Sequence, residues 1–168
     1  MIEGAELIRL LGLKPHPEGG YYRETYRASG IIPASALPPR FKKDRTFATA
    51  ILYLLPAGSK SRLHRLFSDE TWHFYAGGPL TIFEIEPEGR VSRTILGNDP
   101  GSGQRFQHTV KAGIWFGALP CEGAPHSLVG CTVSPGFDFA DFEVGRRKDL
   151  LAMFPRERHT IEMLADES

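Results

Sequence analysis

The segment from Gly58 to Gly77, GSKSRLHRLFSDETWHFYAG, constrains the fold most strongly because it reads as two short strands around a tight turn. Successive side chains of a strand point to opposite faces, so Arg62, His64 and Leu66 are expected on one face of the first strand. Phe-Ser-Asp at 67–69 has the small and polar character of a turn. The segment therefore predicts a β-hairpin with a histidine on one of its faces.

The second strand of this hairpin brings a carboxylate to the same region. Glu70, Trp72 and Phe74 share a face by the same alternation, whereas His73 points to the opposite side. If the hairpin curves around a pocket, the His64 imidazole and the Glu70 carboxylate meet in aromatic surroundings. A structural hydrogen bond inside the sheet is the alternative role for this pair.

Short strand-like segments with turn residues between them continue along most of the chain. Eighteen Gly and 13 Pro also favour a turn-rich, many-stranded fold. About nine or ten strands of this kind predict an antiparallel sandwich or barrel. The further strand candidates are residues 19–27, 47–55, 79–86, 91–96, 106–110, 114–119, 127–133 and 137–144. Helices are expected only near the ends, at residues 3–12, at 148–154 and in a turn around Ile161 and Leu164.

The bulk composition is that of one ordinary globular domain spanning residues 1–168. Net charge is zero, with 20 basic and 20 acidic residues, so no general attraction to nucleic acid or to a membrane surface is expected. No segment approaches the roughly 18 apolar residues of a membrane span. Glu3 and Glu6 do not fit a signal peptide, so a cytoplasmic protein is expected.

Residues 28–46 form the longest stretch without a strand or helix pattern. Three prolines and then four basic residues lie in it, which leaves two roles open: a lid over a pocket, or a mobile, solvated loop. Cys121 and Cys131 are too few for a disulfide framework, although a single bond between them is conceivable.

The hairpin resembles the first sequence motif of the cupin superfamily. Gly58, His64, Glu70 and Gly77 occupy the motif's spacing, but Leu66 stands where that motif has its second histidine. The second cupin motif is matched weakly at residues 109–117, by the glycine at 113 alone.

Several segments of the sequence are similar to one branch of that superfamily, the uncharacterised single-domain Cupin_5 proteins. The similar runs are HPEGGYYRETYR, SRLHRLFSDETWHFYAGGPL, GIWFGA and SLVGCTVSPGFDFADFE, within residues 5–165. The resemblance implies an all-β, cupin-type antiparallel barrel or jelly roll with short peripheral helices at both ends of the chain. It also implies a homodimer, for which the Tyr-rich strand at 21–26 offers a surface.

Metal binding is disfavoured by the same comparison of motifs. Catalytic metal sites generally need three protein ligands. Of the four motif positions, only His64 and Glu70 carry donor atoms, because Leu66 and Phe116 fill the other two. A third ligand would have to come from elsewhere, with Gln107 or His126 conceivable, so we expect a pocket with no metal and no other cofactor.

Several other residues are candidates for ligand contacts. Arg62 shares the predicted face of His64, and Gln107 on a strand can read a polar ligand edge. Trp72, Phe74 and Phe116 can stack on a ring, with plain core packing as the alternative. One of Asp138 and Asp141 is expected to face the pocket, and Cys131 is expected in the core. Loop or surface positions are expected for His16, His108, His126 and His159.

The leading functional hypothesis is a small-molecule pocket with metal-independent epimerase or isomerase chemistry. Here His64 is the general base and Glu70 orients its imidazole. The resemblance to cupin-fold sugar-nucleotide 3,5-epimerases, which work without metal and use a histidine, implies a carbohydrate-like or nucleotide-linked metabolite. A non-catalytic binding or sensing module is the second hypothesis. A metal-dependent oxygenase is the third, and the missing ligands argue against it.

Overall fold

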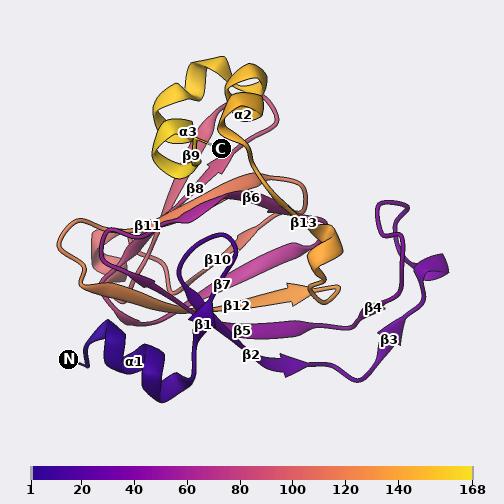
Figure 1. Cartoon of the computed structure of the whole chain (residues 1–168), viewed down its shortest axis with the longest axis horizontal. Helices are drawn as coiled ribbons and strands as arrows, with labels where there is room; N and C mark the ends of the chain where they lie inside the picture. The colour runs from indigo at the N-terminus through magenta and orange to yellow at the C-terminus, as the bar shows by residue number, and fades with distance from the viewer. Residues whose placement is uncertain (1, 168) are drawn as a thin grey trace.

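Two antiparallel β-sheets packed face to face carry most of the chain in the computed structural model, which describes residues 2–167 (Figure 1). The first sheet contains, in spatial order, β1 (Lys14–Pro15), β2 (Tyr21–Arg27), β5 (Thr49–Pro56), β12 (His126–Ser134), β7 (Asp69–Gly77) and β10 (Gln107–Val110). The second contains β13 (Phe142–Val144), β6 (Ser61–Leu66), β11 (Trp115–Pro120), β8 (Leu80–Ile85) and β9 (Val91–Leu96). The all-β prediction is confirmed.

The helices cover the outside of this sandwich, as the sequence predicted. Helix α1 (Gly4–Leu11) packs Leu7, Ile8 and Leu11 on Leu54 and Leu128 of the first sheet. It ends at Gly12, whose φ of 61° is the left-handed conformation that glycine adopts without strain. The helices α2 (Arg147–Met153) and α3 (Arg158–Leu164) sit on the second sheet, at the top of Figure 1. No helix within residues 2–167 is long and apolar enough to cross a bilayer.

Short 3₁₀ turns punctuate the connections between these elements, namely η1 (Ala34–Ala36), η2 (Pro100–Ser102), η3 (Phe139–Asp141) and η4 (Pro155–Glu157). One of them corrects the strand predicted at 137–144, since only β13 is extended there. The Asp138 side chain accepts a hydrogen bond from the Ala140 amide at 2.8 Å, and this favours a turn over a continued strand.

The main core lies between the sheets and contains two of the aromatic residues that the sequence offered as ligand contacts or core residues. Trp72 and Phe116 are each 1% exposed and pack edge to face, with ring centroids 6.2 Å apart. Tyr53 packs on the other side of Trp72, at 5.7 Å. A second apolar cluster joins Leu63 and Trp115 to the C-terminal helices. The alternation of β6 thus sends one set of side chains between the sheets and the other towards α3.

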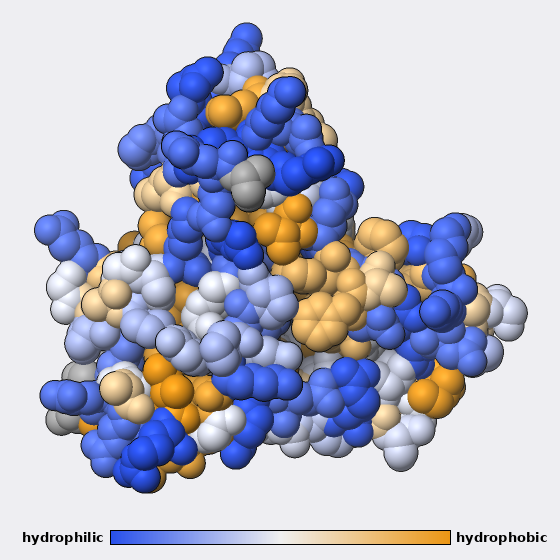
Figure 2. Space-filling model, viewed as in Figure 1, coloured by the Kyte–Doolittle hydropathy of each residue, from blue (hydrophilic) through white to orange (hydrophobic). Residues whose placement is uncertain are grey.

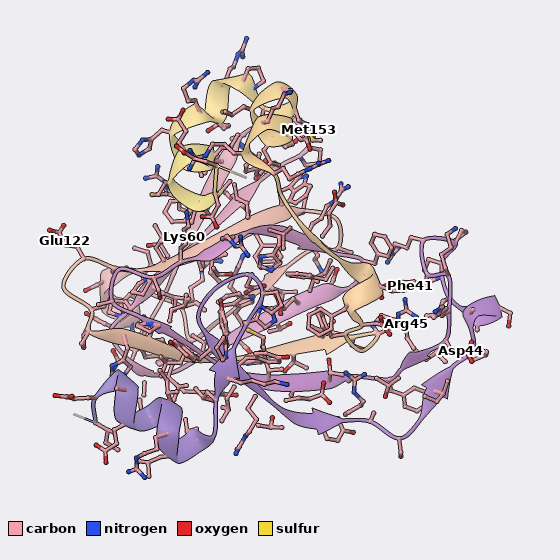
Figure 3. All side chains as sticks on the ribbon, in the orientation of Figure 1. Phe41, Asp44, Arg45, Lys60, Glu122 and Met153 are labelled. Carbon is pink, nitrogen blue, oxygen red and sulfur yellow. The ribbon has the colours of Figure 1, made fainter. Side chains whose placement is uncertain are left out.

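Residues 28–46 form an arm that projects from one end of the sandwich and contains the short pair β3 (Ile31–Ile32) and β4 (Arg45–Thr46). Its returning half is anchored. Phe41 is 3% exposed, and Arg45 forms a two-pronged ion pair with the buried Asp141, with distances of 2.6 and 2.5 Å. Figure 3 shows Phe41 and Arg45 turned towards the body, with Asp44 further out.

Candidate active site

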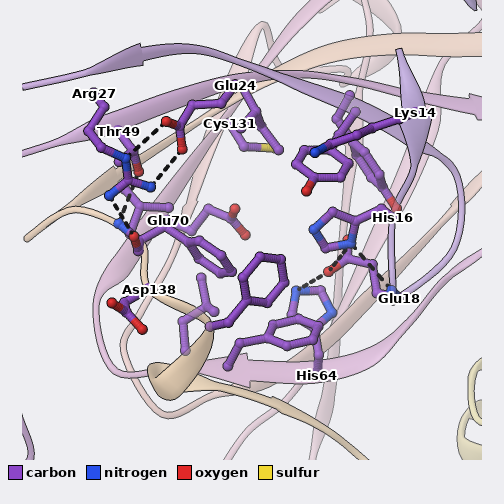
Figure 4. A pocket seen from close by; sticks show the side chains of 18 residues that line it. Lys14, His16, Glu18, Glu24, Arg27, Thr49, His64, Glu70, Cys131 and Asp138 are labelled. Atoms are coloured by element: carbon purple, nitrogen blue, oxygen red, sulfur yellow. Dashed lines mark hydrogen bonds and ion pairs between the residues drawn. The ribbon is translucent and has the colours of Figure 1, made fainter.

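A cavity of about 440 Å³ is lined by 18 residues from both sheets, from the turn before β2 and from the segment around η3 (Figure 4). Its inner wall is buried and carries His16, Glu18, Tyr53, His64, Glu70 and Cys131. Exposed charged groups stand at its mouth, namely Lys14, Glu24, Arg27 and Asp138. Phe137, Phe139 and Phe142 form an aromatic wall, and apolar side chains gather on the surface over this segment in Figure 2. Within the described chain, none of the residues that line this cavity comes from the arm.

His64, on β6, is held at both ring nitrogens. Its Nδ1 lies 2.7 Å from the carbonyl oxygen of Arg62, and a carbonyl can only accept, so Nδ1 carries a hydrogen. Its Nε2 faces a carboxylate oxygen of Glu18, 3.3 Å away. With its hydrogen on Nδ1, the neutral imidazole carries its free lone pair on Nε2, the nitrogen beside Glu18. His64 and Glu18 therefore form an imidazole–carboxyl pair inside the cavity.

Glu18 comes from the turn between β1 and β2, which we call the strap (residues 14–20). The second oxygen of Glu18 accepts a hydrogen bond from the Ser61 hydroxyl at 2.7 Å, and the side chain is 8% exposed. His16 stands on the same strap, where its Nδ1 accepts the Glu18 amide at 3.3 Å. Burial, and secondly the nearby His64, lower the pKa of His16 against the opposing effect of Glu18. The His16 imidazole is therefore neutral at pH 7.

Glu70 is the second carboxyl group on the inner wall of the cavity. Burial above all, and then the charge of Glu18, raise its pKa from 4.5 to about 8, although the Trp72 indole N–H donates to it at 2.9 Å. Glu70 is thus protonated at neutral pH and can give up a proton. The same desolvation raises the pKa of the Cys131 thiol, which keeps that group neutral.

His64 and Glu70 both line the cavity, as the sequence predicted, but they do not pair with each other. Glu18 contacts the imidazole, and the hydrogen-bond partner of Glu70 is Trp72. Glu18 lies 46 positions before His64 in the sequence, on a loop without strand or helix periodicity. Its signal was the HPEGG run, in which two glycines follow a histidine and a glutamate. His16, expected at a loop surface, is likewise part of the inner wall.

Arg62 is not among the residues that line the cavity, and the expectation that it shares a face with His64 is wrong. Ser61 pairs with Ala118 and His64 pairs with Phe116, so Arg62 and Leu63 together stand opposite the single residue between them on β11. Such a β-bulge shifts the alternation by one residue. Ser61 and His64 consequently face the cavity, while Arg62 turns to the strap and the C-terminal tail.

Four other residues predicted as ligand contacts are also not among those that line the cavity. Trp72 and Phe116 are core residues, although Trp72 holds Glu70 and the Phe116 ring lies 4.1 Å from that of His64. Phe74 packs against the same core, and Gln107 is exposed on β10. Alternation along a strand put the two aromatic core residues on the correct face of the sheet. It could not predict how far the cavity extends along that face.

The open question between the two aspartates is settled by the structure. Asp138 stands at the cavity mouth, and Asp141 is buried against Arg45. Of the other histidines, His108 pairs with Glu84, and His126 is 1% exposed with no hydrogen-bond partner for its Nδ1 within the described residues. Cys121 and Cys131 are both free thiols.

The donor atoms around His64 do not fit a cupin metal centre. Leu66 and Phe116 present only hydrocarbon, and the imidazole Nε2 that could bind a metal faces Glu18 instead. Across residues 2–167, no three His, Cys, Asp or Glu side chains are grouped as metal ligands.

The comparisons with known proteins agree with this architecture. The model of the Cupin_5 family, described as "Cupin superfamily (DUF985)", matches residues 5–145. The chain belongs to the Cupin_5 family. This cupin is 39% identical to protein SO0799 from Shewanella oneidensis, with a TM-score of 0.89 and 100% of both chains covered. It is 34% identical to a hypothetical protein from Leishmania major, with a TM-score of 0.88, covering 98% of this chain and 99% of that one.

A more distant likeness concerns the fold alone. Oxalate decarboxylase from Bacillus subtilis is 14% identical, with a TM-score of 0.55, and the match covers 92% of this cupin but only 37% of the decarboxylase. No curated protein matches the chain. The family and fold are thus established by these comparisons.

Proposed function

We propose that this cupin binds a carbohydrate-like or nucleotide-linked metabolite in the cavity and moves a proton on it without a metal, as an epimerase or isomerase. The observation that carries the proposal is an imidazole and a separate, protonated carboxyl group in one cavity. The Nε2 of His64 lies 3.3 Å from Glu18, and the Glu70 carboxyl, with a pKa of about 8, is protonated. A base and an acid ready at neutral pH are what such chemistry needs.

The proton transfer can be written with these groups alone. His64, supported by Glu18, takes a proton from a carbon beside a carbonyl group, and the C–H electron pair moves to the carbonyl oxygen. That oxygen receives the proton of Glu70, which gives a neutral enol. An epimer forms when water gives a proton to the other face of that carbon, the enol proton returns to Glu70, and His64 releases its proton to water. If that carbon carries a hydroxyl group, an isomer forms when His64 returns its proton to the former carbonyl carbon and the hydroxyl proton passes to Glu70 as the new carbonyl forms. No oxidant, reductant or metal is needed for this balance.

The shape and lining of the cavity support a small ring-bearing ligand. Its volume of about 440 Å³ lies within the usual range of metabolite sites, roughly 300–1,000 Å³. The phenylalanine wall at 137–142 can cover the apolar face of a sugar ring, and the charged groups at the mouth can reach hydroxyl or phosphate groups.

Solvent-deuterium exchange tests this function directly. Wild type, Glu18→Gln, His64→Asn and Glu70→Gln are incubated in D₂O with a panel of keto-sugars and sugar nucleotides, and deuterium on ligand carbons is read by NMR. We expect exchange in the wild type and a loss of about 10² to 10⁴ in rate for His64→Asn. Exchange that His64→Asn leaves unchanged contradicts the proposed base. Saturable binding without exchange in the wild type favours the non-catalytic binding module instead.

We also propose that the cupin is a homodimer that pairs through β2. Strand β1 pairs only with Tyr21 and Tyr22, so within the described chain the rest of that side of β2 is an open sheet edge. Tyr26, 56% exposed, and Ile31, 54% exposed, continue this surface onto the arm. Light scattering should give twice the 18.7 kDa chain mass at micromolar concentration, and Tyr26→Lys should weaken the dimer. A wild-type monomer contradicts this proposal.

A further inference from the structure

The strap that carries His16 and Glu18 is fixed from outside the cavity by β6. The Arg62 amide donates to the Glu18 carbonyl at 2.9 Å, and the guanidinium group of Arg62 donates to the carbonyl oxygens of Pro17 and Glu18. One residue of β6 therefore contacts the backbone on both sides of the Pro17–Glu18 peptide bond. The Glu18 side chain continues from this fixed point into the cavity and reaches His64.

The strap and β6 also approach each other too closely for any side chain to separate them. Gly19 has a φ of 112°, and a Cβ atom there would lie 2.1 Å from the Lys60 carbonyl oxygen. The Tyr53 hydroxyl donates to the Gly19 carbonyl at 2.8 Å from the cavity side. The strap is thus held between β5 and the start of β6, and a change at that end of β6 has little slack to absorb it.

Arg62 is in turn held by the C-terminal tail. Asp166, just after α3, accepts from the Arg62 guanidinium at 2.8 Å and contacts the Lys60 ammonium at 2.9 Å. The hydrogen bond from Lys60 and the charges of both basic groups lower the pKa of Asp166, so it is ionised at neutral pH. Figure 3 shows Lys60 below the C-terminal helices, which are seated on this sheet by Leu63, Ile161 and Leu164.

We propose that Arg62 is a positioning residue that couples the C-terminal tail to the His64–Glu18 pair. In this chain of contacts, Asp166 orients Arg62, Arg62 fixes the strap, and the strap presents Glu18 to the imidazole. We call Arg62 and Asp166 the latch; it joins the shared strand β6 to a tail that lies beyond residue 145, where the family match ends. The proposal deepens the proposed function by naming what holds its base, but the coupling itself requires no turnover.

Two variants on the latch and two matched controls test the coupling. Arg62→Met removes the side-chain contacts with the strap and keeps the backbone one, and Asp166→Asn weakens the hold on Arg62 while leaving every apolar contact in place. Arg65→Met removes another ion pair of the same strand, between Arg65 and Glu143, and Glu167→Gln removes another contact of the tail, between Glu167 and Arg147. Neither control residue contacts the strap. Circular dichroism and thermal melting show whether each variant is folded.

The readouts are the ¹⁵N NMR signals of the His64 imidazole and the hydrogen exchange of the strap amides. In Arg62→Met we expect a changed Nε2 shift, because Glu18 no longer faces that nitrogen in one fixed geometry. We also expect the Gly19 amide, which donates to His16, to exchange at least about tenfold faster. Asp166→Asn should show the same changes at a smaller size, and Arg62→Lys should restore part of them.

Both controls should leave the imidazole signal and the strap exchange as in the wild type. Unchanged readouts in Asp166→Asn and in a folded Arg62→Met overturn the proposal, as do equal changes in Arg65→Met. Should Arg62→Met fail to fold, the Asp166→Asn comparison decides alone. These outcomes are separate from the deuterium exchange on sugars, so the coupling can fail while the proposed chemistry stands, and the reverse.

Discussion

Two histidine–glutamate pairs of this cupin have the same composition and different surroundings. His64 and Glu18 meet at 3.3 Å in the cavity, whereas His108 of β10 and Glu84 of β8 meet at 2.5 Å where the two sheets adjoin. The second pair is the shorter contact, yet neither of its members lines the cavity. A close imidazole–carboxylate contact therefore does not identify a site by itself.

The surroundings of the two pairs explain the different roles that we assign to them. His64 faces a space for a ligand, has its tautomer fixed by the Arg62 carbonyl, and shares the cavity with the protonated Glu70. His108 and Glu84 are 16% and 13% exposed and join two sheets, which is the task of a structural bridge. The comparison predicts that the chemistry is lost with the first pair only.

The largest expected effect comes from removing the imidazole of each pair in turn. His64→Asn should lower the rate of ligand deuterium exchange by about 10² to 10⁴, because a general base typically contributes that much. His108→Asn should keep the wild-type exchange rate within about threefold while lowering the melting temperature, since it breaks a partly buried contact. Equal losses of exchange in both variants would remove the distinction between the pairs.

A smaller effect is expected in the pH dependence of stability, to which Glu70 contributes. Its pKa is about 8 in the folded chain against 4.5 for the free group, so between these values the folded state keeps a proton that the unfolded state releases. The free energy of unfolding should therefore fall as pH rises from 4.5 to 8. The size of the pKa shift corresponds to a fall of about a few kcal/mol.

Glu70→Gln should flatten that dependence, because the amide does not titrate. Urea unfolding at intervals between pH 5 and pH 8 gives both slopes. A wild-type slope from pH 5 to 8 that survives unchanged in Glu70→Gln would mean that other groups produce it, and that the cavity lacks the neutral carboxyl on which the comparison depends.

The smallest expected signal is the metal content. Leu66 and Phe116 leave His64 without the companion ligands of a cupin metal centre, so elemental analysis of protein purified without chelators should give far less than one transition metal per chain. About one metal per chain, lost in His64→Asn and retained in His108→Asn, would show that the cavity pair is a ligand set instead of an acid–base pair.

Strand alternation and turn residues predicted most of the fold because both are local properties of the sequence. The hairpin around residues 67–69, the helix ending at Gly12 and the central strands follow from them. They failed at Arg62, where two residues of β6 face one residue of β11, since no local pattern announces a bulge. They failed again at 137–144, where Asp138 starts a turn inside an apolar run.

Only part of the cavity lining could be predicted from the sequence, for a related reason. His64 and Glu70 stand on strands whose periodicity and motif spacing give their direction, and both line the cavity. Glu18 and His16 reach it from an irregular strap whose path depends on contacts with Arg62, Lys60 and Tyr53. Such contacts form only after distant segments meet, so the position of residues 14–20 in the fold could not be predicted from their types alone.

The most direct test of the central claim is the proton state of the cavity carboxyl. In metal-free protein with ¹³C-labelled glutamate, the Glu70 side-chain carboxyl signal is assigned by its loss in Glu70→Gln and followed from pH 4 to 10. The account predicts a carboxyl that is protonated at pH 7 and titrates near 8. A Glu70 signal that is fully ionised by pH 6 would contradict it, because the cavity would then lack the acid that the proposed proton transfer requires.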